Sequence, residues 1–509
     1  MKRLYLSSQW IFAGLLVFSL PFTSFPLVAR LTGSSMVAPL SVLPLLVLLI
    51  FWYVPFLARS GKLPPQTLPL FAFVLAVLVS GLAAFYLPFP PYKSATILHS
   101  GVEALATLAV GVCFYLVVSA WANTTDRLCF LLRSINWSGV AVLGWSLFQA
   151  ITWYRLHSYP DWMWNFQGNV STSLLLYVQR ANGFAYEPSW LAHQLNMLYL
   201  PIWLASVVSG FTVHRVRVWK IHFEHILLVA GVGVLVLSVS RIGWLTFLFM
   251  LALLMLFWNI QGVRFFRRWI FRRHSDREPW TRLLKRGVVL LSILVLLAIY
   301  AGVFVGAGYV LSKLDPTRMA RLFDFSLIRE QSFFHWANQL VFAERIVFWQ
   351  AGWEVFNDFP ILGTGLGNAG YFFPQKLSAF SWALTEIRTL MYQWTALPNI
   401  KSLWVRLLAE TGIVGFALFV SWFYVLWHSA AFLRKAKNPL FKMFGMAGSF
   451  VLIGFLIEGF SLDTFALPYY WISFGLLTAA CEIARRSDLG WRVHENAASR
   501  EHLLGGRYG

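Results

Sequence analysis

Three arginines beside apolar segments are the residues in this sequence best suited to bind a charged ligand. Arg180 lies in Arg180-Ala-Asn-Gly-Phe-Ala-Tyr-Glu-Pro-Ser189, Arg241 in a tight turn between two apolar segments, and Arg345 in a long, less apolar segment. A guanidinium group stays charged, and its planar fork matches phosphate oxygens. Because all three are expected on the same side of a membrane, they predict a site for a diphosphate headgroup.

A second charged group lies at the start of the apolar segment 403–428. Lys401 precedes this segment, and Arg406 and Glu410 lie one helical turn apart inside it. Ionisable groups at membrane depth are costly, so they normally face a protein interior or a water-filled cavity. Arg406 and Glu410 are either substrate ligands or a structural pair at i and i+4, and the spacing favours the pair.

The block Pro360-Ile-Leu-Gly-Thr-Gly-Leu-Gly-Asn368 contains three alternating glycines. A nucleotide-binding loop would need a preceding strand, a following helix and a cytoplasmic location, and the sequence predicts none of these here. The glycines instead predict a turn in which the backbone passes through positive φ, or comes close to a ligand or another helix.

An amphipathic helix is expected just before this block. Phe342, Ile346, Trp349, Trp353 and Phe356 recur at spacings of four and three, which places them on one helical face. Such a helix is suited to a membrane surface, with the charged groups turned to water or to a headgroup. The alternative is a packing helix whose charged face is solvated.

The composition is that of a polytopic membrane protein, because 58% of the residues are hydrophobic and 12% are charged. The net charge of +20 comes mostly from Lys and Arg in short connections, so it indicates topology rather than a nucleic-acid partner. The three cysteines lie in or beside apolar segments and predict no disulfide framework. The sequence has no metal-binding motif such as HExxH, and we expect no metal and no other cofactor.

The predicted fold class is an all-α polytopic integral membrane protein of about twelve transmembrane helices, with one large extracytoplasmic loop that contains short amphipathic helices. The candidate helices are 10–28, 38–58, 67–87, 102–122, 136–152, 190–209, 225–240, 242–258, 287–312, 403–428, 443–462 and 465–483. The predicted domains are helices one to five over 1–152, a first long extracytoplasmic loop over 153–189, helices six to nine over 190–312 with a basic cytoplasmic loop at 259–286, the large extracytoplasmic loop over 313–402, helices ten to twelve over 403–483 and a cytoplasmic tail over 484–509.

The orientation follows from the positive-inside rule. Most of the 41 Lys and Arg residues fall in alternate connections that include both chain ends, so both termini are expected in the cytoplasm and the two long loops outside. The basic run Val263–Arg273 could be a patch for nucleic acid or anionic lipid, but its position favours a cytoplasmic topology anchor.

Together these phrases resemble the O-antigen ligase and O-antigen polymerase superfamily of membrane glycosyltransferases, over roughly residues 180–420. The resemblance rests on Arg180 with Glu187-Pro-Ser189, Ser240-Arg241, Arg345 with Trp349, the Pro360–Asn368 block, and Leu407-Leu-Ala-Glu-Thr-Gly-Ile-Val-Gly415. It implies transfer of a glycan from an undecaprenyl diphosphate carrier to an acceptor sugar, on the outer face of the inner membrane and without metal or nucleotide. It also implies that Arg241 and Arg345 grip the diphosphate and stabilise the departing charge.

On this basis the predicted catalytic residues are Glu187, Arg241, Arg345 and Lys401, and the predicted substrate-binding residues are Arg180, Trp349, Asn368, Arg406 and Glu410. Glu187 is the candidate general base, and its alternative role is to cap the helix that begins at Pro188. His335 is another candidate base, and as a lone loop histidine its alternative is a solvated side chain.

The chain departs from the ligase pattern at one place. Ligases carry a His-Asn pair nine residues before the Glu-x-Gly of the tenth helix, and that register falls on Lys401-Ser402. An ammonium group is a poor base unless its pKa is lowered, so Lys401 is better suited to hold phosphate or substrate. This departure favours a polymerase of O-antigen or exopolysaccharide over a strict lipid A ligase.

Two other classes of protein remain alternatives. A transporter or flippase of a lipid-linked or small solute predicts paired repeats and broken helices near mid-membrane. A receptor or assembly scaffold predicts an outer cap without a basic cavity. The expected partners of the enzyme are a polyprenyl-diphosphate-linked glycan donor, a glycan or lipid-glycan acceptor and the bilayer, and proteins of polysaccharide export or chain-length control are further candidates.

Overall fold

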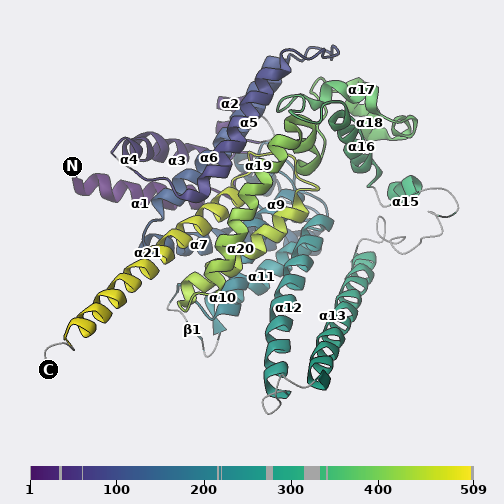
Figure 1. The fold of residues 1–509 in the computed structure, drawn as a ribbon. Coiled ribbons are helices and arrows are strands. Elements are labelled where there is room, and N and C mark those ends of the chain that lie inside the picture. Colours follow the sequence, from purple (N-terminus) through teal and green to yellow (C-terminus); the bar gives the residue numbers. More distant parts are fainter. Residues whose placement is uncertain are drawn as a thin grey trace.

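The chain forms an elongated helical bundle with a cap of short helices at one end (Figure 1). The computed structural model describes residues 2–33, 37–59, 61–214, 217, 218, 221–270, 279–314, 329, 333–339 and 342–505. Within these residues the strands are confined to one short hairpin, in which Arg217 pairs with His222 and Val218 with Ile221. The predicted all-α class is therefore confirmed.

The first half of the bundle runs from α1 to α13. Its helices and strands are α1 (Lys2–Phe18), α2 (Pro26–Thr32), α3 (Val42–Leu48), η1 (Leu49–Tyr53), α4 (Val54–Ala58), η2 (Pro65–Thr67), α5 (Leu68–Ala84), α6 (Ile97–Trp121), α7 (Thr125–Leu156), α8 (Asp161–Val170), α9 (Pro188–Gln194), η3 (Leu195–Tyr199), α10 (Leu200–Ser209), β1 (Arg217–Val218), β2 (Ile221–His222), α11 (Phe223–Leu237), α12 (Arg241–Ile270) and α13 (Pro279–Leu314).

The second half contains the cap and the last three long helices. Its elements are α15 (Phe333–Gln339), α16 (Ala343–Asp358), η4 (Ala369–Phe372), α17 (Phe373–Lys376), η5 (Ala379–Ala383), α18 (Thr385–Arg388), η6 (Thr389–Gln393), α19 (Leu403–Arg434), α20 (Pro439–Glu458) and α21 (Pro468–Gly505).

Several of these helices can cross a membrane. Eight within the described residues are long and apolar enough, and they cover Pro65–Ala84, Ile97–Trp121, Thr125–Leu156, Pro188–Ser209, Arg241–Val263, Gly287–Val310, Leu403–Arg434 and Pro439–Glu458. Three shorter apolar helices, Ser7–Phe18, Val42–Ala58 and Phe223–Leu237, match three further predicted segments. The chain is thus a multi-pass membrane protein by helix length and composition, and the count of twelve stays a prediction.

One predicted helix was wrong. The segment 10–28 is not one helix, because α1 ends at Phe18 and α2 begins at Pro26. Pro21 and Pro26 lack the amide hydrogen that a continuous helix needs, and the break is held by a bridge from Ser24 to Ala38. The predicted connection 259–286 lies between the candidate spans that end at Val263 and begin at Gly287, and both of its ends are helical, since α12 continues to Ile270 and α13 begins at Pro279. Its Arg residues favour helix.

The core of the bundle lies where α9 and α10 pack against α20 and α21. In the span Pro188–Ser209, 89% of the residues in the most apolar 18-residue stretch are buried. Large aromatic rings fill the centre, and Trp422 stacks on Trp471 with ring centroids 5.4 Å apart. By contrast, the most apolar stretch of α13 has no buried residue. α13 packs on α12 through Tyr300, whose hydroxyl donates to the carbonyl of Ala252 at 2.7 Å.

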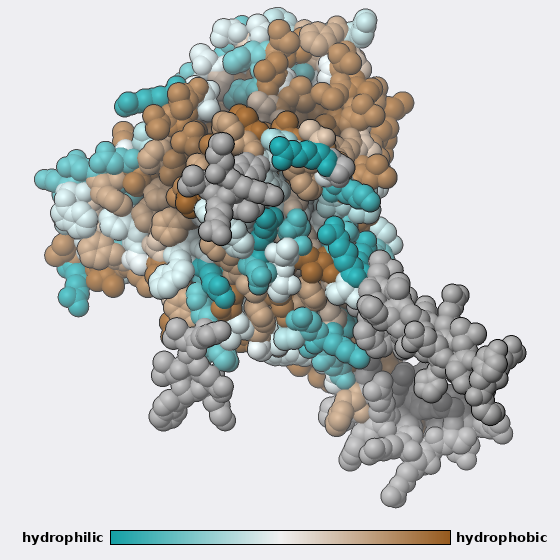
Figure 2. Space-filling model, turned by 90° about the vertical axis from the view of Figure 1, so that its left-hand side faces the viewer, coloured by the Kyte–Doolittle hydropathy of each residue, from teal (hydrophilic) through white to brown (hydrophobic). Residues whose placement is uncertain are grey.

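The two ends of the molecule differ. The start of α1 and the end of α21 lie on the left of Figure 1, whereas α16, α17 and α18 lie at the upper right. Figure 2 views the molecule from the side of the chain ends, and hydrophilic residues gather across the middle of that face. The predicted cytoplasmic orientation of both termini stays a prediction, but the two ends share a side away from the cap.

The cap, which we define as described residues 342–402, has its own small core. Val347, Phe348, Ala351 and Val355 of α16 are fully buried in it. The predicted helix is present, but these four residues form its buried face, while Trp353 of the predicted aromatic face is 48% exposed. Small residues allow the close packing, since a Cβ on Gly352 would lie 2.9 Å from the Ile400 side chain.

Candidate functional site

The glycine block forms a turn that fits into a break in α19. Gly363, Gly365 and Gly367 have φ values of 69°, 83° and 88°, so the predicted positive-φ turn is confirmed. The break lies at Gly412, where φ is 62° and a Cβ would lie 2.1 Å from the carbonyl oxygen of Ile361. The amide of Thr364 donates to the Ala409 carbonyl at 3.0 Å. The turn therefore fixes the cap to the first half of α19.

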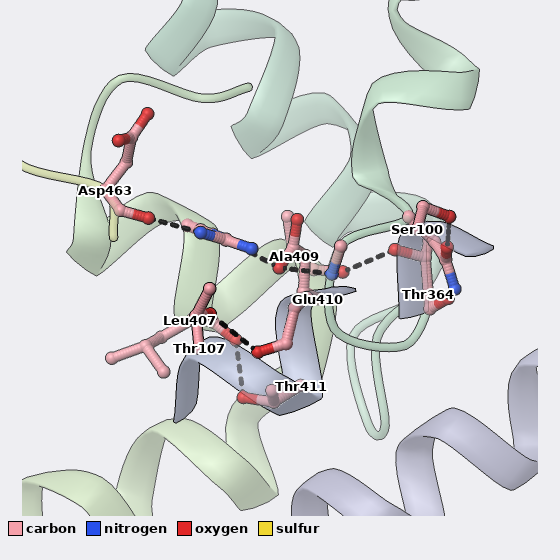
Figure 3. A network of polar contacts seen from close by, with 12 residues as sticks. Ser100, Thr107, Thr364, Leu407, Ala409, Glu410, Thr411 and Asp463 are labelled. Carbon is pink, nitrogen blue, oxygen red and sulfur yellow. Dashed lines mark hydrogen bonds and ion pairs between the residues drawn. The ribbon is translucent and has the colours of Figure 1, made fainter. Parts of the chain in front are cut away.

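Three of the predicted substrate-binding residues meet at this turn (Figure 3). Arg406 Nε donates to Glu410 Oε2 at 2.8 Å, so the predicted i,i+4 pair is present. The same carboxylate oxygen accepts the Gly367 amide at 2.8 Å. Asn368, which is buried, accepts from Ser100 Oγ at 2.7 Å. An internal carboxylate thus occupies the glycine amide that a phosphate would use in a nucleotide-binding loop.

The short segment after α20, residues 459–463, connects this network to the cap. The Arg406 guanidinium also donates through Nη1 to the carbonyl of Asp463. Arg345 Nη1, from α16, donates to the carbonyl of Ser461 at 3.2 Å. Trp349 packs on Phe460 with ring centroids 5.7 Å apart. Two predicted arginines from distant parts of the chain therefore bind one segment, which the sequence had not marked.

Lys401 lies beside Trp349 at the junction of the cap and α19. The Trp349 Nε1 group donates to the Lys401 carbonyl at 3.4 Å. Lys401 has a φ of 57°, an unusual value for a residue with a side chain. Its ammonium group lies 4.0 Å from Glu386 Oε1 and is about one-third exposed. The lysine is therefore a partly exposed cation whose backbone contacts Trp349 of α16.

Arg180 and Arg241 meet at the turn between α11 and α12. Arg180 Nε donates to the carbonyl of Ser238 at 3.1 Å. The amide of Ala181 donates to the carbonyl of Leu237 at 3.0 Å. Arg241 is the first residue of α12, three residues after Ser238. The structure thus brings the first two predicted arginines to one turn.

Glu187 lies at the N-cap position of α9, where its alternative role placed it, but its side chain makes no capping hydrogen bond to the backbone of that helix. Its carboxylate accepts a hydrogen bond from Ser189 Oγ, and its side chain is half-buried. Burial raises the pKa of nearby Tyr177, the charge of Glu187 raises it further, and Arg180 lowers it. Glu187, Arg180 and Tyr177 therefore share one electrostatic environment. The side chain of the other candidate base, His335 on α15, lies outside the described part of the structure.

A buried carboxylate, Glu458, joins the Arg241 turn to the Arg345 segment. Asn196 Nδ2 donates to Glu458 Oε1 at 3.0 Å and to the carbonyl of Gly243 at 2.9 Å. The carbonyl of Glu458 accepts the Ser461 amide at 2.8 Å. Arg241 precedes Gly243 by two residues, and Arg345 donates to Ser461. We call the set Gly243, Asn196, Glu458 and Ser461 the polar bridge.

Part of the chain is similar to a known protein family. Residues 226–420 match the family described as O-antigen ligase. This segment is therefore similar to the O-antigen ligase family. No curated protein matches the chain. The resemblance predicted from the short phrases is therefore confirmed over α11 to the first half of α19.

The matched segment contains most of the predicted site. Its matched residues include Arg241, Arg345, Trp349, Asn368, Lys401, Arg406 and Glu410. Arg180 and Glu187 precede it, and the segment 459–463 follows it. Parts of the chain on both sides of the matched segment therefore contact its charged residues.

Sequence reasoning missed the polar bridge and its histidine. His193 Nδ1 lies 3.1 Å from Glu458 Oε2, and both side chains are at most 3% exposed. The rule that found Arg406 and Glu410 applies equally here, because both residues lie inside predicted spans. Among the described residues, no group of three or more His, Cys, Asp or Glu is arranged to hold a metal ion.

Proposed function

We propose that the protein transfers a glycan from a polyprenyl-diphosphate carrier to an acceptor sugar on the outer face of the membrane. The observation that carries the proposal is the polar bridge, which ties the turn of Arg180 and Arg241 to the segment bound by Arg345. The match to the O-antigen ligase family supports it independently. Together they favour an enzyme over a flippase or an inert scaffold.

The arginines are suited to hold the diphosphate and stabilise it as it departs. When the glycosidic bond to the carrier breaks, negative charge develops on the leaving diphosphate, and fixed cations lower the energy of that transition state. A guanidinium has five N–H donors, so the Arg345 side chain can contact phosphate oxygens while its Nη1 donates to the Ser461 carbonyl. The carbonyl contacts of Arg180 and Arg345 also hold both guanidinium groups in place before substrate arrives.

Glu187 is the proposed proton acceptor. Its half-buried carboxylate lies at the start of α9. Ala192 of α9 packs closely on Gly243 of α12, since a Cβ on Gly243 would lie 2.6 Å from the Ala192 Cβ. The carboxylate is therefore positioned at the same end of the bundle as Arg241. It would take the proton of the acceptor hydroxyl as that oxygen attacks the sugar. Lys401 would contact phosphate or substrate as a cation.

We place the activity on the polymerase side. The sequence has Lys401-Ser402 where ligases carry their His-Asn pair, and Ser402 is buried with its hydroxyl donating to the Gly459 carbonyl at 3.2 Å. This hydroxyl supports the segment 459–463 and does not act as a base. The acceptor would then be a second carrier-linked glycan of O-antigen or exopolysaccharide.

The test is the glycan profile of a strain that lacks this protein. Loss of polymerisation leaves single repeats on the carrier at the outer leaflet, and wild-type protein restores long chains. Long chains that stay on the carrier would assign ligation instead. Single repeats confined to the inner leaflet would assign a flippase, and an unchanged profile would exclude all three.

A further inference from the structure

A basic cavity lies at the opposite end of the bundle from the cap. It has a volume of about 670 Å³, between the end of α4, the end of α6 and the middle of α21. Its lining includes Arg59, Lys62 and Arg486. α4 lies on the left of Figure 1, which is the side that Figure 2 faces and where hydrophilic residues gather. None of the predicted catalytic or substrate-binding residues lines it.

Among the described residues that line this cavity, cations outnumber carboxylates. Within the described part of the chain, no ion pair joins Arg59, Lys62 or Arg486 to a carboxylate. The one acidic residue in the lining, Glu482, accepts from Gln66 Nε2 at 3.1 Å and lies 3.8 Å from Arg485. The cavity therefore carries a net positive charge that an anion would neutralise.

One wall of the cavity is aromatic and rigid. Trp52 and Phe56 stack with ring centroids 5.4 Å apart and an interplanar angle of 14°. The amide of Gly61 donates to the Phe56 carbonyl at 3.0 Å, and a Cβ on Gly61 would lie 2.5 Å from the Phe56 ring. The glycine thus lets the basic segment fold back onto the aromatic wall. An apolar wall beside cations suits a ligand with a charged head and an apolar body.

The position of the cavity identifies that ligand. Asn123, in the lining, belongs to the short connection between the spanning helices α6 and α7, which places the cavity at a membrane boundary. Basic pockets between membrane helices bind the headgroups of anionic lipids. We propose that this cavity binds the phosphate of an anionic phospholipid, with Trp52 and Phe56 against the glycerol and upper acyl region.

Binding of phosphatidylglycerol to the full-length protein in detergent tests the proposal. The wild-type protein is titrated with phosphatidylglycerol and with phosphatidylcholine, and bound lipid is measured by native mass spectrometry. The variant Arg59→Gln/Arg486→Gln should bind phosphatidylglycerol about 10- to 30-fold more weakly, since each basic residue near an anionic headgroup contributes roughly fivefold. The matched control Lys435→Gln/Lys437→Gln removes two exposed cations outside the cavity and should bind as the wild type does.

Three outcomes would overturn the assignment. Equally weakened phosphatidylglycerol binding in both double variants would mean that the surface charge of the whole protein, and not this cavity, attracts the lipid. Displacement of phosphatidylglycerol by equimolar inorganic phosphate would assign the cavity to a soluble anion. A third variant, Ala120→Leu, adds bulk to the lining without changing charge, and unaltered binding in it would place the lipid elsewhere. All variants are compared as monodisperse protein by gel filtration, so that a folding defect is recognised before binding is measured.

Discussion

His193 and Glu458 form a buried pair, with the imidazole Nδ1 3.1 Å from the carboxylate Oε2. They lie on α9 and α20, and the same carboxylate also accepts from Asn196. The Glu458 carboxylate thus binds two buried side chains. Glu458 is also the last residue of α20, directly before the segment whose carbonyls accept from Arg345 and Arg406.

The first prediction concerns the stability of this pair. Glu458→Ala removes the acceptor of His193 and Asn196, and each buried group left unsatisfied costs about 1–3 kcal/mol. We expect a lower thermal midpoint in detergent and less protein in the membrane. Glu458→Gln keeps an oxygen for Asn196 and should be milder. The control Glu386→Ala removes a half-exposed carboxylate and should change the midpoint little. Equal midpoints for Glu458→Ala and the control would contradict the prediction.

A second prediction concerns the break in α19. Gly412→Ala introduces a Cβ at positive φ and 2.1 Å from the Ile361 oxygen, so the glycine turn must separate from α19. We expect a loss of stability above about 2 kcal/mol, because strain and lost contacts add. The matched control is Gly144→Ala in α7, where no atom lies within 4 Å of the new Cβ. Thermal unfolding of the two purified variants checks this, and a Gly412→Ala protein as stable as the control would be inconsistent with the interlocked turn.

Local features of the site could be predicted from the sequence, and long-range ones could not. The Arg406 and Glu410 pair follows from helical spacing, and the positive φ of Gly363 follows from the glycine pattern. The bond between His193 and Glu458 joins residues 265 positions apart, so no spacing rule indicates it. The same limit applies to Arg345, whose partner carbonyl depends on how the cap docks on the bundle.

The third prediction concerns the arginines proposed to hold the diphosphate. Arg241→Ala and Arg345→Ala should each lower the transfer rate roughly 10²- to 10³-fold, as the loss of one preorganised donor does elsewhere. Long-chain glycan in a complemented deletion strain and the protein's level in the membrane are measured together. Arg388→Ala, which removes an exposed arginine of the cap, is the control and should leave chain length unchanged. Normal chain lengths in Arg241→Ala or Arg345→Ala would count against the proposed role of that arginine.

The fourth prediction separates the two roles of Glu187. A helix cap needs only an oxygen acceptor, whereas a general base needs a group that binds a proton. Glu187→Gln keeps the acceptor of Ser189 Oγ and removes the base, so stability should be retained while the transfer rate falls roughly 10²- to 10⁴-fold. A variant that turns over normally but unfolds at lower temperature would leave Glu187 with only a structural role, its contact with Ser189.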